Sequence, residues 1–222
     1  MDVNFQEVRD VTDLEDPIED WNEFEDASGN DSYSAWVLTP IFHSNVSFNG
    51  ESAIWMGTWN SWSDMGSELN NYFSNGISEA EGFNKVWDCA NHSLTALYVV
   101  RSNPNPNTDG GVLSFSSCTL NEGKNLNDLV EADAKWNSFS DTAGFSGGVY
   151  RLFPTAGILA EDDDKDFWQM TAVSSLEAWG SNAQKYVDNN GGVAQSTIYG
   201  EVVSCNDQEI YQASNKRRAA DN

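Results

Sequence analysis

Histidine and basic residues are scarce in this chain. It has 2 histidines, and 11 lysine and arginine residues stand against 35 acidic ones, which gives a formal net charge of −24. A surface of that charge repels phosphate backbones and anionic lipid head groups, so neither nucleic acid nor a membrane is an expected partner. His43 and His92 lie in no recognisable catalytic or metal-binding motif. The second half of the chain has no histidine, which excludes a His-based site repeated in both halves.

Long apolar runs are also missing. The stretch LTALYVV at 94–100 is among the longest, and it is far too short to cross a bilayer. The N-terminal stretch MDVNFQEVRD is charged and has no apolar segment of the signal-peptide type. Either the protein is cytoplasmic, or a signal segment is absent from this chain.

Cysteine is limited to Cys89, Cys118 and Cys205. Their spacings are wide and no Cys-x-x-Cys pair occurs, which argues against a zinc site. We therefore predict no metal site.

The chain does contain an unusual phrase twice, as DWNEFEDASG at 20–29 and KWNSFSDTAG at 135–144. The match extends without a gap over 13–29 and 128–144, with the identities Asp13/Asp128, Leu14/Leu129, Trp21/Trp136, Asn22/Asn137, Phe24/Phe139, Asp26/Asp141 and Gly29/Gly144. This order indicates an internal duplication. We expect Trp and Phe of the phrase to anchor the first helix of each copy, and Asn22 and Asn137 to bond local backbone near the helix end.

The second copy predicts the order β-α-β-β-α-β of a ferredoxin-like unit. Strand formers occupy 110–118, 147–153, 167–173 and 208–213, and apolar residues at helical spacing lie between them. The first copy predicts strands at 33–42, 53–59 and 93–100. We divide the chain into repeat one at 1–103, a linker at 104–110, repeat two at 111–215 and a tail at 216–222.

The opening strand of repeat one has no counterpart in this alignment. The ungapped offset places Val3 opposite Cys118, so the partner of the strand GVLSFSS would fall before Met1. We therefore expect this first strand to be missing.

The predicted strands are apolar at successive positions, as in WVL at 36–38 and ALYVV at 96–100, which favours burial of both faces of each sheet. Two ferredoxin-like repeats packed sheet to sheet would meet that need in an α+β fold. This pattern resembles the dimeric α/β-barrel superfamily, here fused into one chain. The protein would then be a monomer that forms a pseudo-dimer, or a homo-oligomer.

Three segments carry a second resemblance: CTLNEGKNLNDLVEADAKW at 118–136, WNSWSDMG at 59–66 and CANHSL at 89–94. They look like a group of marine bacterial proteins without an assigned activity. The likeness bears on fold and habitat rather than on chemistry.

The expected fold brings the first and last strands of a repeat close together. Cys118 ends the first strand of repeat two and Cys205 precedes its last strand, so we predict a Cys118–Cys205 disulfide with Cys89 free. A bridge would place the protein in the periplasm or outside the cell. Three reduced thiols and a cytoplasmic location stay open as the alternative.

Trp55, Trp59 and Trp62 form an aromatic cluster in repeat one only, since Gln169, Val173 and Leu176 stand at the matching positions. The cluster is either an aromatic core or, with Asn60, the wall of a ligand site. Our leading hypothesis is a binding protein for a small apolar or aromatic ligand or for a protein partner. The superfamily resemblance implies the alternative, a cofactor-independent oxygenase-type enzyme, but we can carry over no catalytic residue. Whether the chain is an enzyme stays open at this point, and no cofactor is predicted.

Overall fold

The computed structural model describes residues 2–8, 11–29, 32–43, 52–89, 92–157 and 164–219. It divides the chain into two compact units. Unit 1 comprises Met1–Leu94 and Tyr211–Asn222, and unit 2 comprises Thr95–Ile210. No helix within the described ranges is long and apolar enough to span a membrane.

Unit 1 is an antiparallel sheet with the strand order β10-β2-β3-β1, and β4 pairs with β1 beside it. Its strands are β1 (Asp2–Val8), β2 (Tyr33–Phe42), β3 (Ser52–Trp59), β4 (Trp87–Cys89) and most of β10 (Glu209–Arg217). Its helices are η1 (Val11–Leu14), α1 (Glu15–Ser28), α2 (Trp62–Asn71), the π-helical turn η2 (Tyr72–Gly76) and α3 (Ile77–Val86).

Unit 2 repeats this plan with the strand order β5-β7-β8-β6-β9. Its strands are most of β5 (Ser93–Arg101), β6 (Gly110–Leu120), β7 (Gly148–Ala156), β8 (Phe167–Val173) and β9 (Val203–Cys205). Its helices are α4 (Leu126–Ala143), α5 (Leu176–Asp188) and α6 (Gly191–Tyr199). The predicted strands of both repeats are thereby confirmed to within a few residues at their ends.

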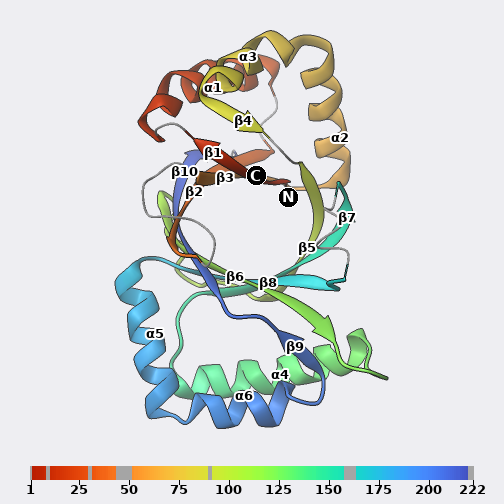
Figure 1. Ribbon diagram of the computed structural model, residues 1–222, viewed down its shortest axis with the longest axis vertical. Helices are drawn as coiled ribbons and strands as arrows, with labels where there is room; N and C mark the ends of the chain where they lie inside the picture. The colour runs from red at the N-terminus through yellow and green to blue at the C-terminus, as the bar shows by residue number, and fades with distance from the viewer. Residues whose placement is uncertain are drawn as a thin grey trace. The chain divides into compact units, whose positions relative to one another are not determined.

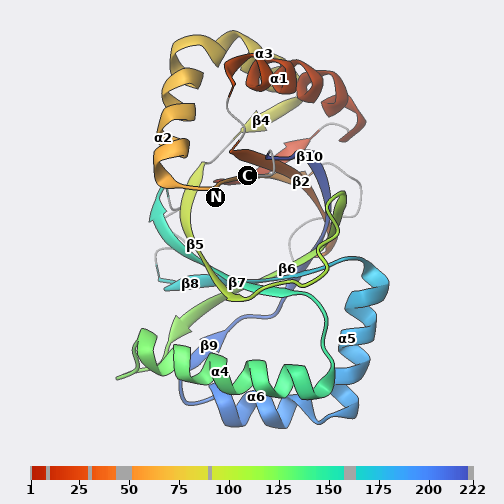
Figure 2. The same cartoon turned by 180° about the vertical axis from the view of Figure 1, so that it is seen from behind.

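Helices cover one face of each sheet, as both views of the chain show (Figures 1 and 2). In unit 1, Leu14 and Ile18 on the first helical segment pack with Val37 and Ala53 of the sheet. In unit 2, Leu129 of α4 packs on Cys118 and Phe167. The burial of these apolar faces makes the largest favourable contribution to the folding free energy of each unit.

The last strand of each repeat pairs with strands of both repeats. Strand β5 pairs with β1 of its own repeat, at Ser93 and Leu94, and with β7 of repeat two, and β10 pairs with β6 of its own repeat and with β2 of repeat one. The compact units differ from the ranges 1–103 and 111–215 because most of β5 belongs to unit 2 and most of β10 belongs to unit 1. The linker at 104–110 lies between β5 and β6, and β10 extends two residues into the tail we placed at 216–222.

The expectation that repeat one lacks its first strand is wrong, because Asp2–Val8 forms β1. Gln6 stands opposite Cys89 in strand register, just as Cys118 stands opposite Cys205. The true counterpart of Cys118 is thus Gln6 and not Val3. The connection between strand and helix is three residues shorter in repeat one, and an ungapped alignment cannot show this.

The polar residues of the repeated phrase bind the last strand of the other repeat. Asn22 Nδ2 donates to the carbonyl oxygen of Lys216 on β10 at 2.9 Å, and Asn137 Nδ2 donates to that of Val100 on β5 at 3.1 Å. The expected local backbone bonds of Asn22 and Asn137 are therefore wrong: each side chain reaches a strand that is distant in the sequence.

The acidic residue of the phrase acts in the same way. Asp26 forms an ion pair with Arg217 at 2.8 Å, and Asp141 forms one with Arg101 at 2.9 Å. The phrase recurs because each copy needs the same Asn and Asp contacts to dock the strand supplied by the other repeat.

Candidate functional site

Two buried carboxylic acids lie on the first two α-helices of unit 1. Glu25 is near the end of α1 and Glu68 is in α2, and their residues are 4% and 6% exposed. Glutamate is rarely buried to this extent without a partner, because an ionised carboxylate loses its hydration. The pair therefore requires an explanation.

Most of the oxygens of this pair have no hydrogen-bond partner within the described part of the chain. Both Glu68 oxygens and Oε2 of Glu25 are buried and unpaired. A buried acceptor without a donor costs about 1–3 kcal/mol, so such groups in native proteins usually mark bound water, a ligand or a reactive site.

Burial also changes the acidity of both groups. The pKa of Glu68 is raised from 4.5 to about 8, first by desolvation and then by the nearby charge of Glu25, against the opposing effect of Arg217. The pKa of Glu25 is raised to about 6 by desolvation, after the opposing effect of Arg217 is included. The pair can therefore hold or release a proton near neutral pH, as general acids and bases must.

Arg217 lies near both carboxyls, and a cluster of aromatic rings occupies the same helices. Arg217 is held by Asp26 and by the carbonyl oxygen of Asn22. The Trp21 ring lies beside Phe24, Tyr72 and Phe83 at centroid distances of 5.4, 5.6 and 6.4 Å. Its buried Nε1 has no hydrogen-bond partner in the described residues.

The helix that carries Glu68 runs directly into a π-helical turn. Tyr72 begins η2 one helical turn after Glu68, and Gly76 ends it. A Cβ at Gly76 would stand 2.8 Å from the Phe24 ring, so only glycine allows this approach. π-Helical turns are rare and frequently occur at functional sites.

Unit 2 provides an internal comparison for the carboxylate pair. The sequence offsets that align the repeats place Ser140 opposite Glu25 and Asn182 opposite Glu68. Asn182 is fully engaged: its Oδ1 accepts from the Ser146 backbone N–H at 3.0 Å, and its Nδ2 donates to the Ser146 carbonyl at 2.8 Å. Only unit 1 replaces these neutral residues with carboxyls.

The predicted tryptophan cluster is divided between different surroundings. Trp55 belongs to the core of unit 1, where it packs on Phe83 and Trp87, and its Nε1 donates to Tyr33 Oη at 2.8 Å. Trp59 lies against the Tyr33 ring, and its buried Nε1 is unpaired in the described residues.

Trp62 begins α2 and is 52% exposed, and Asn60 is exposed just before it. Trp55 and Trp59 therefore share a face of the sheet, while Trp62 does not join them in one wall.

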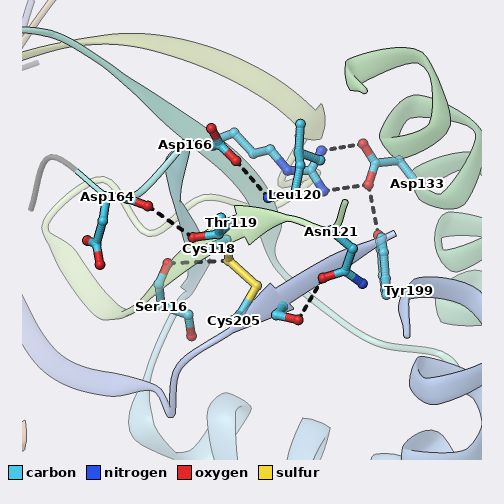
Figure 3. Close-up of a disulfide and its surroundings, with 12 residues drawn as sticks. Ser116, Cys118, Thr119, Leu120, Asn121, Asp133, Asp164, Asp166, Tyr199 and Cys205 are labelled. Carbon is cyan, nitrogen blue, oxygen red and sulfur yellow. Dashed lines mark hydrogen bonds and ion pairs between the residues drawn. A yellow bond between two sulfur atoms is a disulfide. The ribbon is translucent and has the colours of Figure 1, made fainter. Parts of the chain in front are cut away.

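Unit 2 has a different buried polar group, next to the disulfide (Figure 3). Cys118 and Cys205 are bonded, with Cα atoms 4.1 Å apart. Asp133 of α4 accepts two hydrogen bonds from Arg151 of β7, one of them at 2.6 Å, and a third from Tyr199 Oη at 2.8 Å. Burial, followed by the charge of Asp133, raises the pKa of Tyr199. Because the Asp133 carboxylate accepts these three hydrogen bonds, it differs from the unpaired carboxyls of Glu25 and Glu68.

Our sequence reasoning missed Glu25, Glu68 and Arg217. The signal was weak but present: Glu68 lies four residues before Tyr72 and three after Met65, inside the apolar stripe of its helix. A carboxylate in that stripe, at the position that aligns with Asn182 of the second copy, is the pattern that could have revealed the pair.

Comparisons with known proteins identify the fold. No family model matches the chain, and no curated protein matches it. Among solved structures, an anthrone oxidase-like protein is 13% identical, with a TM-score of 0.53 over 99% of this chain and 95% of that one. A candidate monooxygenase from Fusobacterium nucleatum is 9% identical, with a TM-score of 0.53 over 97% and 91%.

A dye-decolorizing peroxidase from Bacteroides thetaiotaomicron is 7% identical, with a TM-score of 0.50 over 97% and 93% of the two chains. At these identities the likeness shows the fold alone. The protein therefore has the ferredoxin-like α+β fold of the dimeric α/β-barrel class, and our fold-class prediction is confirmed. The likeness to marine bacterial proteins stays a prediction.

Proposed function

We propose that this protein is an oxygenase-type enzyme that acts on a small apolar or aromatic molecule, with Glu25 and Glu68 as its proton-transferring groups. The observation that carries the proposal is the set of three unpaired, buried carboxylate oxygens, present only in unit 1. A binding protein needs only a complementary surface, whereas an enzyme needs polar groups with perturbed acidity. Unit 1 has such groups.

The chemistry suited to the pair is removal of a weakly acidic proton from the substrate. A carboxylate with a pKa of about 6 to 8 is a stronger base than an ordinary glutamate. An aromatic-activated methylene that loses a proton becomes electron-rich enough to react with O₂. Overall, the CH₂ group and O₂ give a carbonyl group and water, so no external reductant is required.

The surroundings favour an aromatic substrate. Trp21, Phe24 and Tyr72 place ring faces and edges beside the helix that carries Glu25, and rings pack well against flat apolar molecules. The fold neighbours support this choice of chemistry, since they include an anthrone oxidase-like protein and a candidate monooxygenase.

Haem, which some proteins of this fold class bind, does not fit the residues of this site. Haem iron takes an axial histidine, thiolate, methionine or tyrosine. In the described part of unit 1, His43 lies against the Tyr211 ring and His92 is exposed just before β5, so neither joins Glu25 and Glu68. Tyr72 is near the pair, but its ring is packed against Trp21 and Phe73. The described residues also contain no cluster of three or more potential metal ligands. We derive no step through a haem.

A second candidate function is ligand binding without catalysis, at Trp59, Trp62 and Asn60. The unpaired Nε1 of Trp59 and the exposed ring of Trp62 favour it. The disulfide supports a periplasmic or secreted location for either function, because such bonds persist in oxidising compartments. The proposed partner is a small molecule in both cases.

The test combines oxygen uptake with binding. The purified chain is mixed with a panel of aromatic compounds that carry activated methylene groups, and O₂ consumption and tryptophan fluorescence are followed. We expect turnover by the wild type and a loss of about 10²–10⁴-fold in kcat for Glu68→Gln, with binding retained. The matched control is Asn182→Asp, which alters the equivalent position of unit 2 and should leave turnover unchanged.

Binding without O₂ uptake would support the second candidate. Neither binding nor uptake, or equal turnover by the Glu68→Gln variant, would contradict the proposed enzyme.

A further inference from the structure

Helix α2 is attached to unit 1 in an unusual way. Its only buried residue is Glu68, and its other side chains are exposed or half-buried. An ordinary surface helix is held by an apolar face, which does not respond to pH. Here the deepest side chain of the helix is an ionisable group.

The equivalent helix of unit 2 is held differently. Asn182 of α5 bonds the backbone of Ser146, and Lys185 Nζ donates to the carbonyl oxygen of Gly144 at 2.6 Å. The offset that aligns the helices places Glu68 and Asn71 at these two positions. An asparagine tether keeps its strength between pH 5 and 9, whereas a buried carboxyl does not.

The groups around Glu68 oppose its ionisation on balance. Glu25 approaches from α1, Asp64 lies in α2 itself, and Arg217 is the cation from β10. Arg217 is already paired with Asp26 at 2.8 Å, which weakens what it can offer to Glu68. Ionised Glu68 is therefore better accommodated in water than in its buried position.

The ends of α2 allow such a movement. It begins at the Ser61 cap, where Ser61 Oγ accepts from the Asp64 N–H, and it ends in the π-helical turn η2. Beyond η2 the helical run continues into α3, and a π-helical segment inside a helix is a common place for it to bend, so α2 can move about η2 without breaking the sheet.

We propose that α2 is a pH-operated flap, which lies closed over the Glu25–Glu68 site while Glu68 is protonated and opens when its carboxyl ionises. The part of this inference that concerns substrate access rests on the proposed function. The movement of the helix itself is argued from the contacts of α2 alone. The closed state predominates below about pH 6 and the open state above about pH 8, in line with the acidity of the two carboxyls.

Hydrogen exchange measured by mass spectrometry on the full chain tests the flap. Exchange is followed at pH 5.5 and pH 8.5, with times scaled for the intrinsic rate. We expect the protection of 62–71 to fall at least tenfold at the higher pH, while the protection of 176–188 in α5 stays constant. Glu68→Asn, which installs the residue of unit 2, and the isosteric Glu68→Gln should both abolish the change.

Protection of 62–71 that is independent of pH, or an equal change in α5, would overturn the flap. So would a pH response that persists in both variants. The wild-type comparison requires no variant, so a poorly folded mutant does not remove the test. Substrate turnover without a pH response of 62–71 would refute the flap alone, and a pH response without binding or turnover would refute the proposed function alone.

Discussion

Replacing Glu68 by glutamine should stabilise the protein at alkaline pH and leave it almost unchanged in acid. The folded chain keeps the Glu68 proton up to about pH 8, whereas the unfolded chain releases it near 4.5. Between these values the unfolded state binds fewer protons, so the free energy of unfolding of the wild type falls as pH rises. The glutamine variant lacks this loss.

The expected gain in the free energy of unfolding follows from the pKa shift of Glu68. About 3.5 pH units separate 4.5 from about 8, and each unit corresponds to about 1.4 kcal/mol, which gives about 5 kcal/mol above pH 8. This is a ceiling, because opening of α2 alone would hydrate the carboxylate at a smaller cost. We expect a measured gain of about 2–5 kcal/mol at pH 9 and less than about 1 kcal/mol at pH 4.5.

Urea unfolding at pH 4.5, 7 and 9, followed by tryptophan fluorescence, measures this gain as the difference between the variant and the wild type. The exposed Glu131→Gln is the matched control, since it removes the same charge from the surface of unit 2. A difference that does not depend on pH, or a wild type that becomes more stable between pH 5 and pH 8, would refute the assignment of Glu68 as a buried, protonated group.

Three further predictions concern the fold. Asn22→Ala and Asn137→Ala should each lower the free energy of unfolding by about 1–3 kcal/mol, and hydrogen exchange should show the first loosening β10 and the second loosening β5. Cys205→Ser opens a bridge between residues 87 apart and should cost about 4 kcal/mol in urea unfolding, matched by the wild type in reductant. Asp133→Asn leaves Arg151 buried without a counter-charge and should cost about 3–5 kcal/mol by thermal unfolding, whereas the exposed Asp207→Asn should cost almost nothing.

Much of the fold could be predicted because its signals are local. The strands β2, β3, β6 and β8 are runs of β-branched, aromatic and other apolar residues, and the helices α1 and α4 share the repeated phrase. Strand β1 was missed because its alternation, Val3 and Phe5 among polar residues, is short and because the alignment allowed no gap. Its pairing with β3 depends on partners that lie some fifty residues away.

The pairing of β5 with β7 and of β10 with β2 could not be predicted from the residues. Both β5 and β10 have the composition of ordinary strands, and nothing in that composition selects β7 or β2 as the neighbour. Side chains of the repeated phrase bind these strands instead: Asn22 and Asp26 bind β10, and Asn137 and Asp141 bind β5. Those residues were visible as a repeat, but their partners belong to tertiary structure.

The candidate site was hidden by the composition. Glu25 and Glu68 are two of 35 acidic residues, and charge alone cannot separate a buried carboxyl from a solvated one. The tryptophans attracted attention because they are rare and differ between the repeats. The same comparison between the repeats, made for the acidic residues, finds Glu25 aligned with Ser140 and Glu68 aligned with Asn182, and so points to the pair.

The two units differ in how the hydrogen bonds of their buried charged groups are satisfied. Unit 2 has a disulfide and an ion pair whose carboxylate accepts three hydrogen bonds, whereas unit 1 keeps buried carboxyls without partners. Unpaired buried groups lower stability, and they persist in proteins mainly where reactivity requires them. If unit 1 carries the proposed activity, the Glu68→Gln variant should therefore gain stability and lose turnover together.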